Sequence, residues 1–164
     1  MKKKKKNKII LGISVAIIIG VVIVVNYSAE QTKIKGLNFG NNLQAIQEEL
    51  KKIGIDFQTE MTLFEEEDIT REELLEYLDL HISKIEELIL RYDDLEPPEA
   101  FSSSVELFKL SSQSQLEADK QIIQWLKNDD EGAKIRSEAL LQEAFEYELA
   151  ALAKFNAAKA GVEP

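Results

Sequence analysis

The chain of 164 residues has no cysteine, one histidine and three prolines. The lack of cysteine excludes disulfide bonds, thiolate zinc sites, iron–sulfur clusters and cysteine nucleophiles. A single histidine, His81, removes most catalytic triads and every metal site that needs two histidines. The length predicts one folded domain.

Positive charge is scarce outside the first eight residues. The net charge is −10, although six lysines precede Ile9 and no acidic residue occurs before Glu30. The rest of the chain therefore carries −16. Such an acidic body repels phosphate groups, so we expect no nucleic-acid binding by the folded part.

An apolar run, residues 9–25, has no charged side chain and only Ser14 as a polar interruption. As a helix it spans about 25 Å, close to the lower limit for a bilayer core. Extended by two residues, it predicts a transmembrane helix at 9–27. The alternative is a cleaved signal peptide, but the run exceeds the usual signal core of about 7 to 15 residues and Tyr27-Ser28-Ala29 is a poor cleavage site.

The basic tail, residues 1–8, predicts the orientation of this helix, because flanking lysines stay on the cytoplasmic side. We expect a single-pass cell-membrane protein whose C-terminal domain is extracytoplasmic. The lysines could instead bind anionic lipid or a cytosolic partner. Gly12, Ala16 and Gly20 recur every fourth residue, which is the small-residue spacing of packed membrane helices. This spacing predicts helix–helix association in the bilayer, and two copies of this chain could form a homo-oligomer in this way.

The remaining sequence predicts an all-α fold. Residues 28–42 are polar, with Gly36 and Gly40 as breaks, and read as a stalk or as a short extension of the membrane helix. Residues 43–164 predict four helices with short connections, and short connections make consecutive helices antiparallel. An up-down-up-down four-helix bundle follows. No segment after the membrane helix shows sustained strand-like alternation.

Each predicted helix has apolar residues at spacings of three and four, which place them on one face. The first three helices are expected to bury Leu43, Ile46, Leu50, Ile53, Phe57, Met61 and Phe64, then Leu74, Leu78, Ile82, Ile85, Ile89 and Tyr92, then Phe101, Val105, Phe108, Leu116, Ile123 and Leu126. The fourth is expected to bury Ile135, Leu141, Phe145, Leu149, Leu152 and Phe155. Thr70 and Glu73 predict a capping box at the start of the second helix.

This layout, with Leu95-Glu96-Pro97-Pro98 as its one motif-like piece, resembles uncharacterised single-pass surface proteins of prokaryotes, especially archaea. In those proteins a lysine-rich start and one apolar helix precede an acidic helical domain. The bundle is also similar to the extracytoplasmic sensor domains of chemoreceptors. Those domains are flanked by two membrane helices, whereas one apolar span is evident here, so a sensor role would need a partner to transmit the signal.

Polar residues on the third helix are the candidate site. Continuation of the buried stripe turns Ser112, Gln115 and Asp119 toward the interior, where polar groups need hydrogen-bond partners. They could line a ligand cavity, contact another subunit or bond one another. Trp125 departs from the main stripe and predicts a contact surface.

The sequence offers little for catalysis or for a cofactor. His81 is expected at the edge of the core beside a carboxylate, and the Glu-x-x-His pairs of a di-iron bundle are missing. The acidic clusters 65–68 and 129–131 match no calcium loop and suit helix starts. We therefore expect no metal and no cofactor. A non-enzymatic accessory or scaffold protein that binds another membrane or surface protein is the leading hypothesis, with a ligand-binding sensor or capture domain as the alternative.

Overall fold

The computed structural model describes residues 30–161. The basic tail, the predicted membrane helix at 9–27 and the Gly12, Ala16 and Gly20 spacing lie outside the described residues. Within residues 30–161, no helix is both long enough and apolar enough to cross a membrane.

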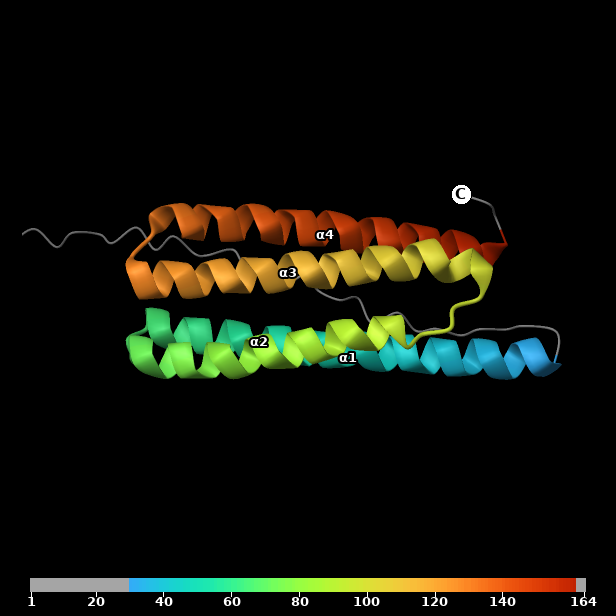
Figure 1. Cartoon of the computed structure of the whole chain (residues 1–164), viewed down its shortest axis with the longest axis horizontal. Helices are drawn as coiled ribbons and strands as arrows, with labels where there is room; N and C mark the ends of the chain where they lie inside the picture. The colour runs from blue at the N-terminus through green and yellow to red at the C-terminus, as the bar shows by residue number, and fades with distance from the viewer. Residues whose placement is uncertain (1–29, 162–164) are drawn as a thin grey trace, which may run out of the picture.

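The described chain is all-α, as predicted, and contains no strand. Its elements are α1 (Glu30–Glu65), α2 (Arg71–Asp93), the short 3₁₀ helix η1 (Glu99–Phe101), α3 (Ser102–Asn128) and α4 (Glu131–Ala160). Consecutive α-helices run in opposite directions (Figure 1). The first two form one hairpin and the last two form a second hairpin.

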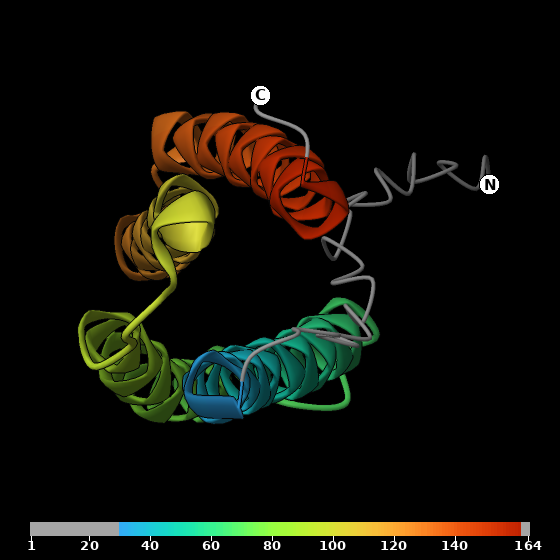
Figure 2. The same ribbon diagram turned by 90° about the vertical axis from the view of Figure 1, so that its right-hand side faces the viewer.

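The helices follow one another around an arc when viewed along their axes (Figure 2). Neighbours in sequence are neighbours in space, but no Cα atom of α1 lies within 8 Å of a Cα atom of α4. Large side chains span this wider separation. Phe39 and Leu43 of α1 belong to the same buried cluster as Phe155 of α4. Phe101 of η1 lies between them, with its ring centroid 5.7 Å from that of Phe39 and 5.0 Å from that of Phe155.

The first helix begins earlier than the sequence predicts. Residues 30–42 are part of α1, and the helix continues through Gly36 and Gly40 instead of forming a separate stalk. A glycine inside a helix costs only about 1 kcal/mol relative to alanine. Phe39 and Leu43 are buried at helical spacing, and this burial offsets the cost.

The connections are short because local groups terminate each helix. The Thr70 hydroxyl accepts a hydrogen bond from the Glu73 amide while the Glu73 carboxylate accepts one from the Thr70 amide, which confirms the capping box. Asp130 caps α4 by accepting a hydrogen bond from the Gly132 amide. Asp129 adopts a left-handed conformation, with φ of 52°, and so turns the chain between α3 and α4 within two residues.

The predicted stripes of the first three helices are confirmed. Most of their members are buried in three adjoining clusters, and the few exceptions, such as Ile53 and Phe64, pack against these clusters while partly buried. Spacings of three and four residues were sufficient to predict the buried residues of these helices, because each stripe faces the centre of the arc.

The predicted stripe of the fourth helix is wrong for three of its six members, although Phe155 is buried and the partly buried Leu152 packs against the same cluster. Ile135 and Leu149 are 66% and 48% exposed, Phe145 is also exposed, and among the large apolar members only Phe155 is fully buried. Apart from Phe155, the buried residues of α4 are small or acidic: Ala133, Ser137, Ala144, Glu148 and Ala151. These positions also recur at spacings of three, four and seven.

Small side chains explain this choice of face. Ser104 and Ala118 are buried on the opposing α3, and the Ser111 hydroxyl donates a hydrogen bond of 2.8 Å to the Ala144 carbonyl on α4. A side-chain bond to a neighbouring helix backbone requires the two helices to lie close together. Leucine or phenylalanine at this contact would hold them apart, so the large side chains of α4 lie elsewhere.

The α3–α4 contact predicts different effects of one substitution at adjacent alanines. Ala151→Leu should lower the free energy of unfolding by about 1 to 3 kcal/mol, because Ala151 is fully buried and the larger side chain overfills the contact. Ala150→Leu is the control, since Ala150 is exposed, and should change it by less than about 0.5 kcal/mol. Chemical unfolding in mild detergent measures both, and equal effects would refute the close packing.

Candidate functional site

Besides three serines on α3 and α4, Ser104, Ser114 and Ser137, the buried polar residues form two groups on the inside of the arc. One group contains His81 and Asp119, and the other contains Gln47, Tyr92, Ser112 and Glu148. Both groups connect the α1–α2 hairpin to the α3–α4 hairpin. They are the most unusual chemistry in the described chain, because buried polar groups need partners.

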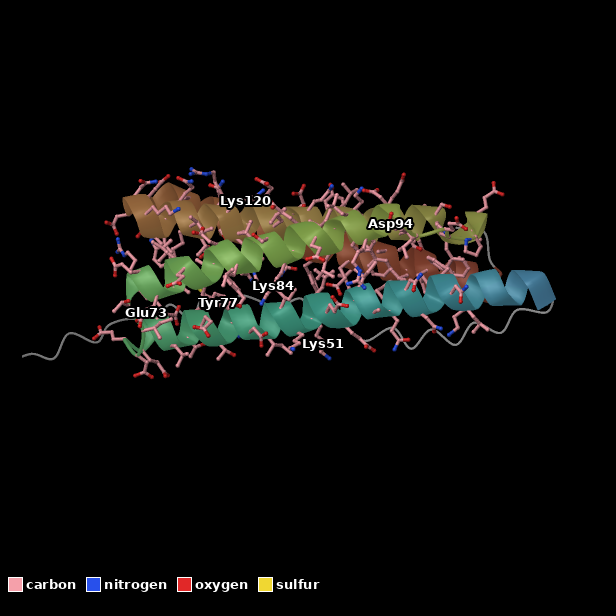
Figure 3. The ribbon with its side chains drawn as sticks, turned by 60° about the horizontal axis from the view of Figure 1, so that its bottom comes forward. Lys51, Glu73, Tyr77, Lys84, Asp94 and Lys120 are labelled. Atoms are coloured by element: carbon pink, nitrogen blue, oxygen red, sulfur yellow. The ribbon has the colours of Figure 1, made fainter. Side chains whose placement is uncertain are left out.

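His81 of α2 and Asp119 of α3 form a fully buried pair. The Nε2 atom of His81 lies 2.9 Å from the Oδ2 atom of Asp119, and both side chains are at most 2% exposed. The imidazole stacks on Phe57, with ring centroids 4.9 Å apart, and on Tyr77, at 5.7 Å. Tyr77 lies between α2 and α1 (Figure 3). The expected carboxylate partner is present, but the pair is deep in the core and not at its edge.

The electrostatics of this pair follow from burial. Desolvation raises the pKa of Asp119, and the hydrogen bond and charge interaction with His81 oppose this rise. The Nδ1 atom of His81 is buried without a hydrogen-bond partner. The Nε2 and Oδ2 atoms share one hydrogen bond, and burial keeps both side chains away from bulk solvent.

The second group is a chain of hydrogen bonds across three helices. Gln47 Nε2 of α1 donates to the Tyr92 hydroxyl of α2 at 2.7 Å. The Tyr92 hydroxyl lies 3.3 Å from the Ser112 hydroxyl of α3, which donates to the Phe108 carbonyl at 3.1 Å. If each group donates to the next, all three bonds are satisfied in one direction. Burial raises the pKa of Tyr92, so its hydroxyl keeps the proton that this order requires.

Glu148 extends this group to α4. It is 5% exposed, and it makes no hydrogen bond or ion pair with another described residue. Burial raises the pKa of Glu148 to about 7. Its charge in turn contributes to the raised pKa of Tyr92, so the two groups lie close enough to interact.

The structure places the predicted site residues in different environments. Ser112 and Asp119 are buried, and each bonds a side chain of the other hairpin. Gln115 is half-buried on α3 and belongs to neither group. Trp125 is partly buried near the α3–α4 turn, where its Nε1 atom donates to Glu131 at 3.2 Å and the Lys134 ammonium lies 4.7 Å from its ring centroid. Trp125 therefore does not share a site with Ser112.

Sequence reasoning missed Gln47 and Glu148. The signal for Glu148 was present, since it lies four residues after Ala144 and three before Ala151, on the small-residue face. Gln47 follows the buried Ile46 and shows no pattern of its own. Its role comes from Tyr92, which is 45 residues away in sequence.

The acidic cluster 129–131 supplies a helix cap and ion pairs. Asp129 pairs with Arg71 at 2.8 Å, and Asp130 pairs with Arg136 at 3.0 Å while capping α4. Across residues 30–161, no group of three or more histidine and acidic side chains could hold a metal ion.

Large apolar side chains lie on the outer surface. Leu80 and Leu90 of α2 are 63% and 66% exposed, and Leu110 of α3 is also exposed. The large apolar residues exposed on α4 are three members of its predicted core stripe, Ile135, Phe145 and Leu149. Clusters of exposed apolar side chains are typical of protein contact surfaces.

Comparison with family models, with curated proteins and with solved structures finds no match to this chain.

Removal of one member of the buried pair should be more harmful than removal of both. Asp119→Ala leaves the imidazole of His81 buried without a partner and should cost about 3 to 5 kcal/mol of stability. The double variant His81→Leu with Asp119→Leu should recover much of this loss, because an apolar pair needs no hydrogen bond. Chemical unfolding of the single and double variants measures the coupling energy between the two residues. Stability losses that simply add would contradict this coupling.

Glu148 predicts a pH-dependent stability. Below about pH 4.5 the carboxyl is protonated in both the folded and unfolded states. Between pH 4.5 and 7 the folded state keeps a proton that the unfolded state releases, so stability falls as pH rises and levels off above 7. At pH 8 the Glu148→Gln variant should be more stable than the unmodified chain by up to about 3 kcal/mol.

The difference between these two proteins should vanish near pH 4.5, because glutamine resembles the protonated acid. Glu138→Gln is the control, since Glu138 is exposed on the same helix. Urea unfolding from pH 4.5 to 8.5 supplies the measurement, and a constant difference across that range would contradict the assignment.

Proposed function

We propose that this chain is a non-enzymatic accessory or scaffold protein, anchored in a membrane, whose helical domain binds another membrane or surface protein. One observation carries the proposal. The domain exposes large apolar side chains on α2, α3 and α4, including Leu90 and Ile135, which are each 66% exposed. Water disfavours such surfaces unless a partner covers them.

The environment of the ionisable groups supports binding over catalysis. His81 and Asp119 are sealed among Phe57 and Tyr77, so a substrate has no contact with them. General acid–base catalysis requires the group to reach the proton that it transfers. Apart from the buried Glu148, the remaining acids of residues 30–161 lie on the surface or cap helices.

The anchor is the apolar run at 9–27, which precedes α1 in the sequence. In this proposal the lysine-rich start stays in the cytoplasm and the four helices lie outside it. Because the membrane helix and α1 are separated by few residues, the domain would lie close to the bilayer. A partner in the same membrane would then meet the domain at a high effective concentration.

The alternative proposal is a ligand-binding sensor or capture domain with polar residues of α3 at its site. Ser112 and Asp119 argue against it, because both already bond side chains of the other hairpin. A ligand would have to replace these bonds. Its signature would be a ligand-dependent rise in melting temperature.

The test is crosslinking in membranes of cells that make the protein. A lysine-reactive reagent should join this chain to one or a few specific proteins, which mass spectrometry would identify. Protease added to intact cells should also digest the C-terminal domain, which checks that it lies outside the cytoplasm. Absence of any specific crosslinked protein would refute the binding function, and protection of the domain from protease would refute its placement.

A further inference from the structure

A groove runs along the outer surface between α2 and α3. Its volume is about 470 Å³, and its lining residues are Glu86, Ile89, Leu90, Gln113, Leu116 and Glu117. Ile89 and Leu116 form an apolar floor and are nearly buried, whereas Leu90 projects beside them into solvent. We call this feature the α2–α3 groove.

Ion pairs between the two helices stand at both ends of the α2–α3 groove. At one end the Lys120 ammonium lies 3.2 Å from carboxylate oxygens of both Glu86 and Glu117, and Figure 3 shows Lys120 on α3 where it runs beside α2. At the other end Lys109 of α3 pairs with Asp93 of α2. The two lysines are eleven residues apart, which is about 16 Å along the helix.

This length and lining fit a helix. An amphipathic helix places apolar anchors at positions i, i+4 and i+7, which span about 10.5 Å. Such a set fits between the two ion pairs, with the anchors over Ile89 and Leu116. Leu90 and the exposed Leu110 would contact the sides of the bound helix.

The charge around the groove indicates which kind of partner helix would bind there. The α2–α3 groove is lined by two carboxylates, Glu86 and Glu117, which share the single ammonium of Lys120 and so keep one net negative charge between them. Residues 30–161 contain 29 acidic and 14 basic side chains. A second copy of this domain or an anionic lipid surface would be repelled, whereas lysine or arginine beside the anchors would be attracted.

We propose that the α2–α3 groove binds an amphipathic helix of a partner protein that has leucine-sized anchors flanked by lysine or arginine. This inference deepens the proposed function and depends on it, because it names the surface and the chemistry of the partner. The bound helix covers Leu90 and Leu110 and brings its basic residues to the two groove carboxylates.

The full-length chain in its own cells provides the test. A photoreactive phenylalanine analogue replaces Leu90 in one variant and Leu80 in a matched control. Both leucines are on α2 and are similarly exposed, but only Leu90 lines the groove. We expect crosslinking from position 90, with a yield from position 80 that is about tenfold lower.

The sequence of the crosslinked peptide shows whether the bound segment is a basic amphipathic helix. Support requires a segment with apolar residues at helical spacing and a net positive charge. Glu86→Gln with Glu117→Gln should then lower the yield about fivefold, because each rim charge contributes modestly. Glu72→Gln with Glu76→Gln removes the same charge from α2 outside the groove and should leave the yield unchanged.

Several outcomes would overturn the inference. These are equal yields from positions 80 and 90, no crosslink from position 90, or a crosslink to a second copy, to lipid, or to a polar or acidic segment. If lysine crosslinking still finds a specific partner, the proposed function stands and the groove assignment alone fails. If neither reagent captures a protein, both fail.

Discussion

The close contact between α3 and α4 determines much of the rest of the structure. Alanine and serine on both helices allow the Ser111 hydroxyl to reach the Ala144 carbonyl. Small residues occupy most of the buried face of α4, and its large apolar residues Ile135, Phe145 and Leu149 are exposed. The same constraint that builds the second hairpin therefore creates apolar surface that is available for contact with other proteins.

Polar side chains then fix how one hairpin sits on the other. The His81–Asp119 pair and the Tyr92–Ser112 contact both join α2 to α3. A shift of one helix by a single turn, about 5.4 Å, would break both contacts and leave polar groups buried without partners. Apolar packing alone tolerates such shifts more easily, so these bonds specify the alignment of the two hairpins.

The sequence predicted the fold better than the site. Apolar spacing located four helices and the cores of three, because large residues dominate those contacts. It was wrong for half of the predicted stripe of α4, because most buried residues of that helix are small and Ile135, Phe145 and Leu149 are exposed. Asp119 and Ser112 were correctly expected to face inward, but Gln47 and Glu148 depend on neighbours distant in sequence. The membrane anchor and its small-residue spacing stay predictions, since they lie outside residues 30–161.

Glu148 couples assembly of the domain to the acidity of its surroundings. This carboxyl belongs to the second hairpin, and its charge affects Tyr92 of the first. In water at neutral pH it would be ionised, whereas inside the arc its affinity for hydrogen ions is higher. Docking of the two hairpins and uptake of a proton are therefore linked events, and a mildly acidic medium favours both.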